Sequence, residues 1–265
     1  MPYFENNGIK INYEIEGDGP DLLMIHGFAS SIKSNWGQTQ WIETLKKENR
    51  LILMDCRGHG ESDKPKNPDQ YGPHMVKDII KLLDHLSIKK TNFFGYSMGS
   101  RLTLHVLLQQ PLLVKSAILG GFVMSLPSEQ RTEAAKQQGM ATAAALRADD
   151  IDSIKNPISK GFRLFAESQG GDLEALAAVK EGFYARTDKL PATSKEMRIA
   201  LKKISVPVLT VVGTDDFIPG DKTLIAQLVP NACHFQIQGK DHLTVVPDRK
   251  FHMVVRAFLN HVNNR

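Results

Sequence analysis

The pentapeptide Gly95-Tyr96-Ser97-Met98-Gly99 holds a serine between two glycines, at a spacing that suits nucleophilic catalysis. An apolar run over residues 92–95 predicts a strand before this serine, and residues 98–109 predict a helix after it. A sharp turn between the two exposes the serine hydroxyl, and the flanking glycines avoid collisions there. The sequence therefore predicts Ser97 as a nucleophile, with a helix-capping serine as the alternative.

A serine hydroxyl is a poor nucleophile at neutral pH, so it needs a base and an acid that orients the base. His242 follows an expected strand at 234–237, and Asp216 follows an expected strand at 206–212. The carboxyl ends of parallel strands meet at one edge of a sheet, where Ser97 is also expected. We therefore expect His242 to take the proton of Ser97, and Asp216 to hold the imidazole.

Other side chains compete for the roles of acid and base. Asp215 remains the alternative acid, because position along the chain does not separate it cleanly from Asp216. Asp241 is disfavoured as the partner of His242, because adjacent side chains rarely face each other. The competing histidines lie on expected helices, at a strand start or in turns: His59, His74, His85, His105, His234, His252 and His261.

The elements that must position these residues alternate between strands and helices. Apolar runs predict strands at 21–25, 51–54, 92–95, 114–119, 206–212 and 234–237, after a strand pair within 3–16. Residue spacing and composition predict helices at 38–48, 74–88, 98–109, 221–228 and 247–260. This alternation predicts an α/β fold, with a mostly parallel, doubly wound sheet and helices on both of its faces.

The alternation stops between residues 122 and 200, where the composition favours helix and no strand signal occurs. Residues 1–121 and 201–265 are therefore expected to form the core domain, and 122–200 an inserted helical part. Its apolar side chains are expected to pack the insertion about twice as often as they line a pocket. They are Phe122, Met124, Met140, Leu146, Phe162, Leu164, Phe165 and Phe183.

These motifs together resemble the α/β-hydrolase superfamily over nearly the whole chain. Besides the Ser97 turn and the loops of Asp216 and His242, two segments carry the resemblance: His26-Gly27-Phe28, and residues 55–62 (DCRGHGES). The second segment is similar to the D-x-R-G-x-G-x-S turn of the family. Family members place the acid three residues after the glycine that ends the strand, which matches Gly213 and supports Asp216.

The resemblance implies an inserted helical cap and an oxyanion hole. Its backbone donors would be the N–H of Met98, after the nucleophile, and the N–H of Phe28, after His-Gly. Ala29 is the alternative to Phe28 as the second donor. Two such donors would stabilise the oxyanion of a tetrahedral intermediate.

The type of nucleophile narrows the chemistry that the resemblance implies. Haloalkane dehalogenases and epoxide hydrolases of the family use aspartate where this chain has Ser97. The expected activity is carboxylesterase-like cleavage of esters with small to medium apolar groups, through an acyl-enzyme. The alternatives are a carbon–carbon bond hydrolase of meta-cleavage-type products, a cofactor-free perhydrolase and a non-catalytic ligand-binding member of the fold.

Composition and charge set the broad class of protein. The chain has 42% hydrophobic residues and a formal net charge of +4, from 33 basic and 29 acidic side chains. The densest basic stretch, 195–203, holds no aromatic side chain, so nucleic-acid binding is not expected. The first residues lack a signal-peptide pattern, and no apolar run reaches the roughly 20 residues of a membrane span. A cytoplasmic protein is expected.

No cofactor and no metal site are expected. The histidines lack the tight pairing of zinc motifs, and the two cysteines, Cys56 and Cys233, lie far apart outside any CxxC. The expected partner is a small-molecule ester, and the oligomeric state is not predicted. Arg101, Arg163 and Arg186 are the candidates for binding a substrate carboxylate.

Overall fold

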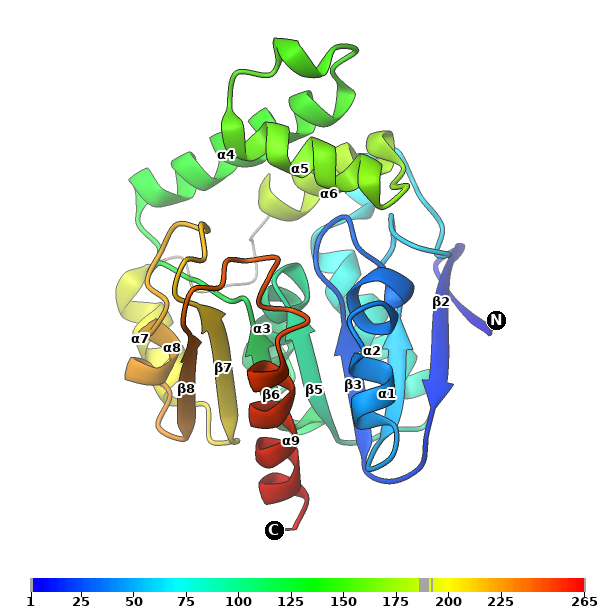
Figure 1. The fold of residues 1–265 in the computed structure, drawn as a ribbon, viewed down its shortest axis with the longest axis vertical. Coiled ribbons are helices and arrows are strands. Elements are labelled where there is room, and N and C mark those ends of the chain that lie inside the picture. Colours follow the sequence, from blue (N-terminus) through cyan, green and yellow to red (C-terminus); the bar gives the residue numbers. More distant parts are fainter. Residues whose placement is uncertain (1, 186–190, 192, 265) are drawn as a thin grey trace.

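The described strands form one eight-stranded sheet in the computed structural model, which describes residues 2–185, 191 and 193–264. The strands are β1 (Tyr3–Asn6), β2 (Ile9–Glu16), β3 (Asp21–Ile25), β4 (Arg50–Met54), β5 (Thr91–Tyr96), β6 (Val114–Gly120), β7 (Val208–Gly213) and β8 (Ala232–Ile237). Their order is β1-β2-β4-β3-β5-β6-β7-β8 (Figure 1). β2 pairs antiparallel with β1 and β4, and the other pairs are parallel, which confirms the predicted mostly parallel sheet.

The predicted strand pair at the start of the chain is the β1–β2 hairpin. Asn6 pairs with Ile9, so the connecting turn contains only Asn7 and Gly8. Both turn residues have positive φ, 54° and 76°. Two-residue hairpin turns of this kind favour asparagine and glycine, because these residues adopt positive φ at low cost.

Helices cover both faces of the sheet, so both sets of alternating strand side chains are buried. Leu22 and Met24 of β3 pack into a core with α1 (Trp41–Leu45) and α9 (Arg249–Asn263). Leu23 and Ile25 of the same strand pack into the opposite core, with α2 (Pro73–His85), α3 (Met98–Gln109) and α8 (Leu224–Leu228). This arrangement explains why the parallel strands have continuous apolar sequences.

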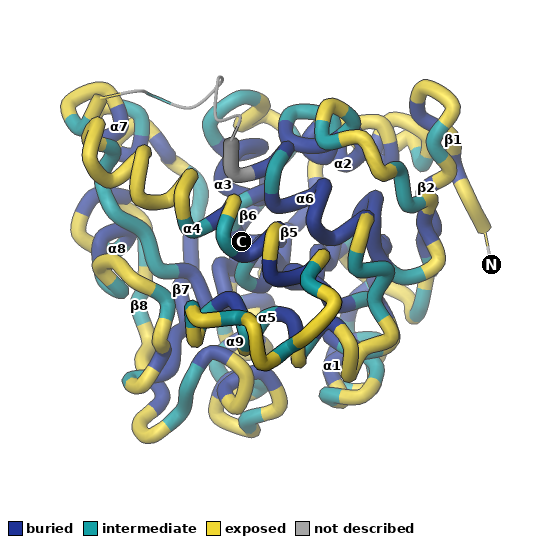
Figure 2. The backbone as a smooth tube through the Cα atoms, turned by 90° about the horizontal axis from the view of Figure 1, so that it is seen from above, coloured by how far each residue is buried: buried dark blue, intermediate teal, exposed yellow. Residues whose placement is uncertain are grey.

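Three helices of the insertion lie above the carboxyl ends of the strands (Figure 1). They are α4 (Glu129–Arg147), α5 (Pro157–Ser168) and α6 (Leu173–Ala185), and the view from above shows that α6 is buried along most of its length (Figure 2). Helix α7 (Ser194–Lys202) instead lies beside the sheet and contacts α8. The stretch 122–200 therefore contributes to two places in the molecule.

The segment after β3 differs from the helix expected at 38–48. It contains a single π-helical turn, η1 (Ile32–Gly37), and then the short α1, which spans only Trp41–Leu45. Gln40 precedes α1 with a φ of 66°, a left-handed conformation that cannot continue a helix.

Cys56 is buried and Cys233 exposed, and both are free thiols. None of the helices in the described ranges is both long and apolar enough to cross a membrane.

Candidate active site

Ser97 stands at the junction of β5 and α3 in a backbone conformation that non-glycine residues rarely adopt (φ 51°, ψ −107°). A Cβ on Gly95 would lie 2.4 Å from the backbone of Gly99, and a Cβ on Gly99 would lie 1.9 Å from the Ile25 carbonyl oxygen. The two glycines are therefore required by the close approach of β3, β5 and α3. The strained turn holds the Ser97 hydroxyl at the carboxyl edge of the sheet.

Hydrogen bonds connect Ser97, His242 and Asp216 in one line. The Ser97 Oγ lies 2.8 Å from His242 Nε2, and His242 Nδ1 lies 2.8 Å from Asp216 Oδ2. With the proton on Nδ1, the imidazole donates to Asp216 and accepts from the Ser97 hydroxyl. The other oxygen of Asp216 accepts from the backbone N–H of Ile218 at 2.9 Å. Asp216 is 6% and His242 4% exposed, so water hardly competes for these bonds.

The two competing carboxylates point elsewhere. Asp215 is exposed and accepts a hydrogen bond from the Thr214 hydroxyl at 2.9 Å. The Oδ1 of Asp241 accepts from the backbone N–H groups of Leu243 and Thr244, which lowers its pKa and shapes the loop that carries His242. The structure thus brings Asp216, and neither neighbour, to the imidazole.

Tyr96, inside the serine turn, has a positioning role that the sequence did not suggest. Its hydroxyl donates a hydrogen bond to the backbone carbonyl of His242. Burial raises the pKa of Tyr96 well above its usual value, so the hydroxyl keeps the proton that it donates. The strand that presents Ser97 therefore also holds the loop of His242.

A rigid turn follows β3 beside Ser97. The Gly27 N–H donates to Asn35 Oδ1 at 2.8 Å, and the Gly27 carbonyl accepts from His26 Nδ1 at 2.7 Å. Ala29 has a φ of 59°, which fixes the exit from the turn. Within the part of the chain that the structure describes, the N–H groups of Phe28, Ala29 and Met98 have no hydrogen-bond acceptor. These are the donors considered for an oxyanion hole.

A cavity of about 510 Å³ opens onto Ser97 and His242. One wall comes from the segment after β3 and is polar: Ser30, Ser34, Asn35, Gln38 and Thr39. The other walls, from α5 and from the loops after β7 and β8, are mainly apolar: Pro157, Ile158, Phe162, Phe165, Phe217, Leu243 and Val246. The site thus combines a catalytic-type serine with a pocket of mixed polarity that suits a small molecule.

Comparison with known proteins identifies the architecture. Residues 20–158, just over half of the chain, match the family model described as alpha/beta hydrolase fold. The chain belongs to this family. Three curated relatives show how varied the family is.

The chain is 32% identical over 114 residues to a putative 2-succinyl-6-hydroxy-2,4-cyclohexadiene-1-carboxylate synthase of Bacillus subtilis, a match covering 41% of this chain and 40% of that protein. It is 26% identical to an (E)-2-((N-methylformamido)methylene)succinate hydrolase of Acinetobacter baylyi, over 94% of this chain and 89% of that protein. It is 27% identical to a 3-oxoadipate enol-lactonase of the same organism, over 78% of this chain and 76% of that protein.

The DCRGHGES segment of this α/β hydrolase has a structural role. The buried Asp55 carboxylate accepts from the backbone N–H groups of Ile32 and Glu61, and a Cβ on Gly60 would collide with it. Arg57 forms a buried, bidentate ion pair with Asp78, with both contacts at 2.6 Å. These bonds join the end of β4 to α2 and to the segment that carries the polar pocket wall.

Of the eight apolar side chains singled out in the insertion, Phe162 and Phe165 line the cavity. Leu146 and Phe183 are fully buried, whereas Met140 and Leu164 are largely exposed. Phe122, Leu146 and Phe183 are thus core residues, whereas the exposed Met140 and Leu164 belong neither to the core nor to the pocket.

Of the three arginines proposed to bind a substrate carboxylate, the structure describes two, and each has contacts within the protein. Arg163 donates to the carbonyl oxygens of Ala145, Leu146 and Ala148, so it caps the carboxyl end of α4. Arg101 lies over the ring of Phe183, with 5.6 Å between its Cζ and the ring centroid. Arg186 lies outside the described residues.

Lys180 is a buried cation next to the pocket that the sequence did not indicate. Its Nζ lies 3.9 Å from the ring centroid of Phe28 and 4.1 Å from that of Phe162. Burial, followed by the charge of Arg101, lowers its pKa to about 7. Its contact with the ring of Phe28 connects α6 of the insertion with the turn after β3.

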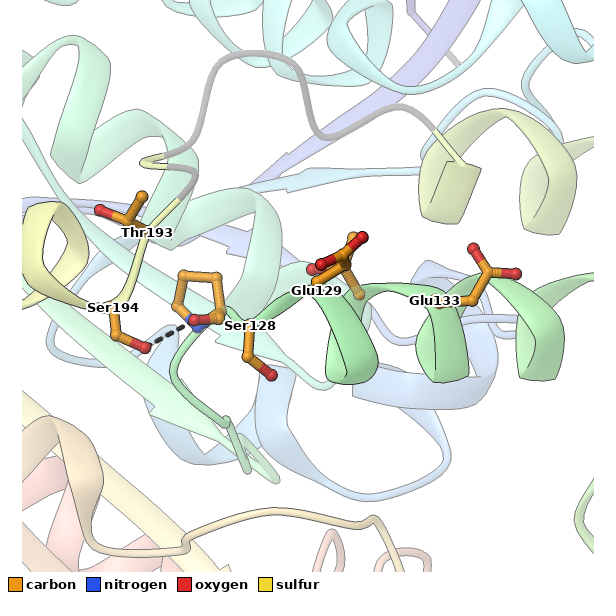
Figure 3. A pocket seen from close by; sticks show the side chains of 7 residues that line it. Ser128, Glu129, Glu133, Thr193 and Ser194 are labelled. Atoms are coloured by element: carbon orange, nitrogen blue, oxygen red, sulfur yellow. Dashed lines mark hydrogen bonds between the residues drawn. The ribbon is translucent and has the colours of Figure 1, made fainter.

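A second cavity, of about 580 Å³, lies where α4 and α7 begin (Figure 3). Its lining includes Ser128, Glu129, Glu133 and Thr193, and the Ser194 hydroxyl, which donates to the Pro127 carbonyl at 2.6 Å. It contains none of the residues around Ser97. Its described lining offers hydroxyls and carboxylates but no histidine that could activate a hydroxyl, so it is not the candidate active site.

Proposed function

We propose that this α/β hydrolase cleaves carboxylic esters through an acyl-enzyme on Ser97. The observation that carries the proposal is the line of two 2.8 Å hydrogen bonds from Ser97 through His242 to Asp216. A serine that donates to a buried, carboxylate-oriented imidazole is the arrangement that acyl transfer requires.

The proposed reaction has two halves. Ser97 Oγ attacks the ester carbonyl while His242 Nε2 takes its proton, and the N–H groups of Met98 and Phe28 donate to the oxyanion that forms. His242 then gives the proton to the leaving alcohol, which leaves Ser97 acylated. In the second half, His242 takes a proton from water, the hydroxide attacks the acyl group, and Ser97 regains its proton. Asp216 stabilises the imidazolium in both halves.

The pocket and the relatives support a small to medium substrate. A volume of about 510 Å³ suits a group of that size, and its aromatic walls suit an apolar portion. The enol-lactonase named above acts, by its name, on a lactone, which is a cyclic ester. The two relatives named above that align over most of this chain are named for substrates related to dicarboxylic acids, succinate and 3-oxoadipate. We propose that the acyl portion is of this short, oxygen-bearing kind.

Hydrolysis of p-nitrophenyl esters from acetate to decanoate tests the reaction. We expect turnover with an optimum at short chains, and a fall of roughly 10⁶-fold in kcat for Ser97→Ala. Ser168→Ala is the matched control, because Ser168 is exposed and, among the described residues, bonds only within its own helix and to its neighbour. Equal activity of Ser97→Ala and wild type would contradict the role of Ser97. If a fluorophosphonate labels Ser97 but no ester is cleaved, the nucleophile is correct and the ester assignment is wrong.

A further inference from the structure

Asn35 joins the active-site turn to the polar wall of the pocket. It lies in η1, is 5% exposed and lines the cavity. Its Oδ1 accepts the N–H of Gly27 at 2.8 Å. Because a backbone N–H needs an acceptor, this bond fixes which end of the amide faces Gly27 and leaves Nδ2 on the other side.

The Nδ2 of Asn35 is a buried donor that the fold does not use. Among the described residues it has no hydrogen-bond partner. The hydroxyls of the same wall are occupied: Ser30 and Ser34 bond each other at 2.7 Å, and Thr39 donates to the Asn35 carbonyl. A buried donor without an acceptor destabilises the folded state, so an unused buried side-chain donor in a residue of the pocket wall points to an acceptor that arrives with a ligand.

The Asn35 amide is also close to the nucleophile. A Cβ placed on Gly27 would lie 3.4 Å from Asn35 Oδ1 and 3.6 Å from Ser97 Cβ, so Gly27 lies against both residues. Asn35 and Ser97 also line the same cavity, so an acyl group attached to Ser97 would share that cavity with the Asn35 side chain. Shielding from water strengthens a hydrogen bond made there.

We propose that Asn35 binds a second oxygen of the substrate, a keto or carboxylate oxygen on the acyl chain beyond the scissile carbonyl. The inference rests on the proposed function, because it places an acyl group on Ser97. It defines the substrate class as short oxo-acyl or dicarboxylic monoesters and the corresponding lactones. Asn35 has two separable tasks: Oδ1 positions the Gly27–Phe28 turn, and Nδ2 selects the substrate.

Matched methyl esters separate the two tasks. We expect wild type to prefer methyl 4-oxopentanoate and monomethyl succinate over methyl pentanoate by about tenfold in kcat/KM, which is the effect of one hydrogen bond. Asn35→Asp keeps an acceptor for Gly27 but replaces the donor, so it loses this preference, most strongly for the anionic monomethyl succinate. Asn35→Ala also loses the preference, and in addition its kcat falls for every ester. Circular dichroism and thermal unfolding check that both variants fold.

Two results would overturn the inference: a wild type without the preference, or variants that slow all esters equally and keep it. A binding measurement decides the case if no ester is cleaved. In Ser97→Ala labelled with nitrogen-15, the side-chain NH₂ signals of Asn35, assigned by their absence in Asn35→Asp, are expected to shift with methyl 4-oxopentanoate and not with methyl pentanoate. Equal shifts with both esters would refute the role of Asn35. Failure of ester cleavage together with the selective shift would refute only the proposed reaction.

Discussion

The sheet edge beside Ser97 and helix α5 above it differ in how closely their backbones are packed. Around Ser97 the backbones are so close that a methyl group on Gly99 would overlap a carbonyl oxygen at 1.9 Å. On α5, by contrast, a Cβ at Gly161 would have no atom within 4 Å. The sheet edge at Gly99 therefore fixes atoms by backbone contact, whereas α5 has room for a side chain at Gly161.

The largest effect is expected from Asp216, at the sheet edge. Asp216→Asn keeps the shape but removes the charge that orients His242, so kcat should fall by roughly 10⁴-fold while KM changes little. Asp215→Asn, the matched control one residue earlier, should leave kcat within about a factor of two, because Asp215 is exposed. Steady-state kinetics on a short p-nitrophenyl ester measures both. A large loss in Asp215→Asn with an active Asp216→Asn would reverse the assignment of the acid.

Alanine at one glycine of each region tests the contrast in stability. Gly99→Ala should lower the free energy of unfolding by about 3 kcal/mol or more, because the new methyl overlaps β3. Gly161→Ala should raise it by about 0.5–1 kcal/mol, because alanine favours a helix and the site is open. Urea unfolding followed by circular dichroism measures both changes. Similar losses in the two variants would show that the regions do not differ in this way.

A pH-dependent effect is expected from Lys180, where the insertion contacts the turn after β3. Its pKa falls from an ordinary 10.5 to about 7 in the folded protein. Between these pH values the unfolded chain holds a proton that the folded protein lacks. Lys180 therefore makes the free energy of unfolding rise with pH, by up to about 1.4 kcal/mol per unit.

Lys180→Met removes this proton and keeps an apolar stem. Between pH 7 and pH 9, the free energy of unfolding of wild type should therefore rise relative to that of Lys180→Met. Urea unfolding at pH 7, 8 and 9 measures this difference. Parallel pH profiles for the two proteins would contradict it. Lys160→Met, at a half-exposed lysine on α5, is the control and should follow wild type.

Sequence patterns predicted the elements of the sheet well, because buried parallel strands leave continuous apolar runs and sharp turns leave glycines. The serine turn and the two loops after β7 and β8 were predicted on the same grounds, and the structure places their side chains within hydrogen-bond distance. The catalytic roles of Ser97, His242 and Asp216 stay a prediction until they are measured.

Features that depend on packing between distant segments could not be predicted. An amphipathic helix shows which side chains are buried, but not that Phe162 faces the pocket while Leu146 faces other helices. The capping role of Arg163 depends on where α4 ends relative to α5, and the polar wall around Asn35 belongs to no motif. Tyr96 lies inside the serine motif, but its positioning role could not be predicted, because that role depends on the contact between its hydroxyl and the His242 carbonyl.

The order of the strands along the chain has a consequence for synthesis. Ser97 is held by β5 and by its backbone bond to Gly120 of β6, all made from the first half of the chain. His242 follows β8, the last strand, at 145 residues from Ser97. Because domains generally fold as units, the Ser97 turn and the His242 loop are expected to assemble together, only after β8 has been made. The nascent chain would therefore lack the contact between Ser97 and His242 until the last strand joins the sheet.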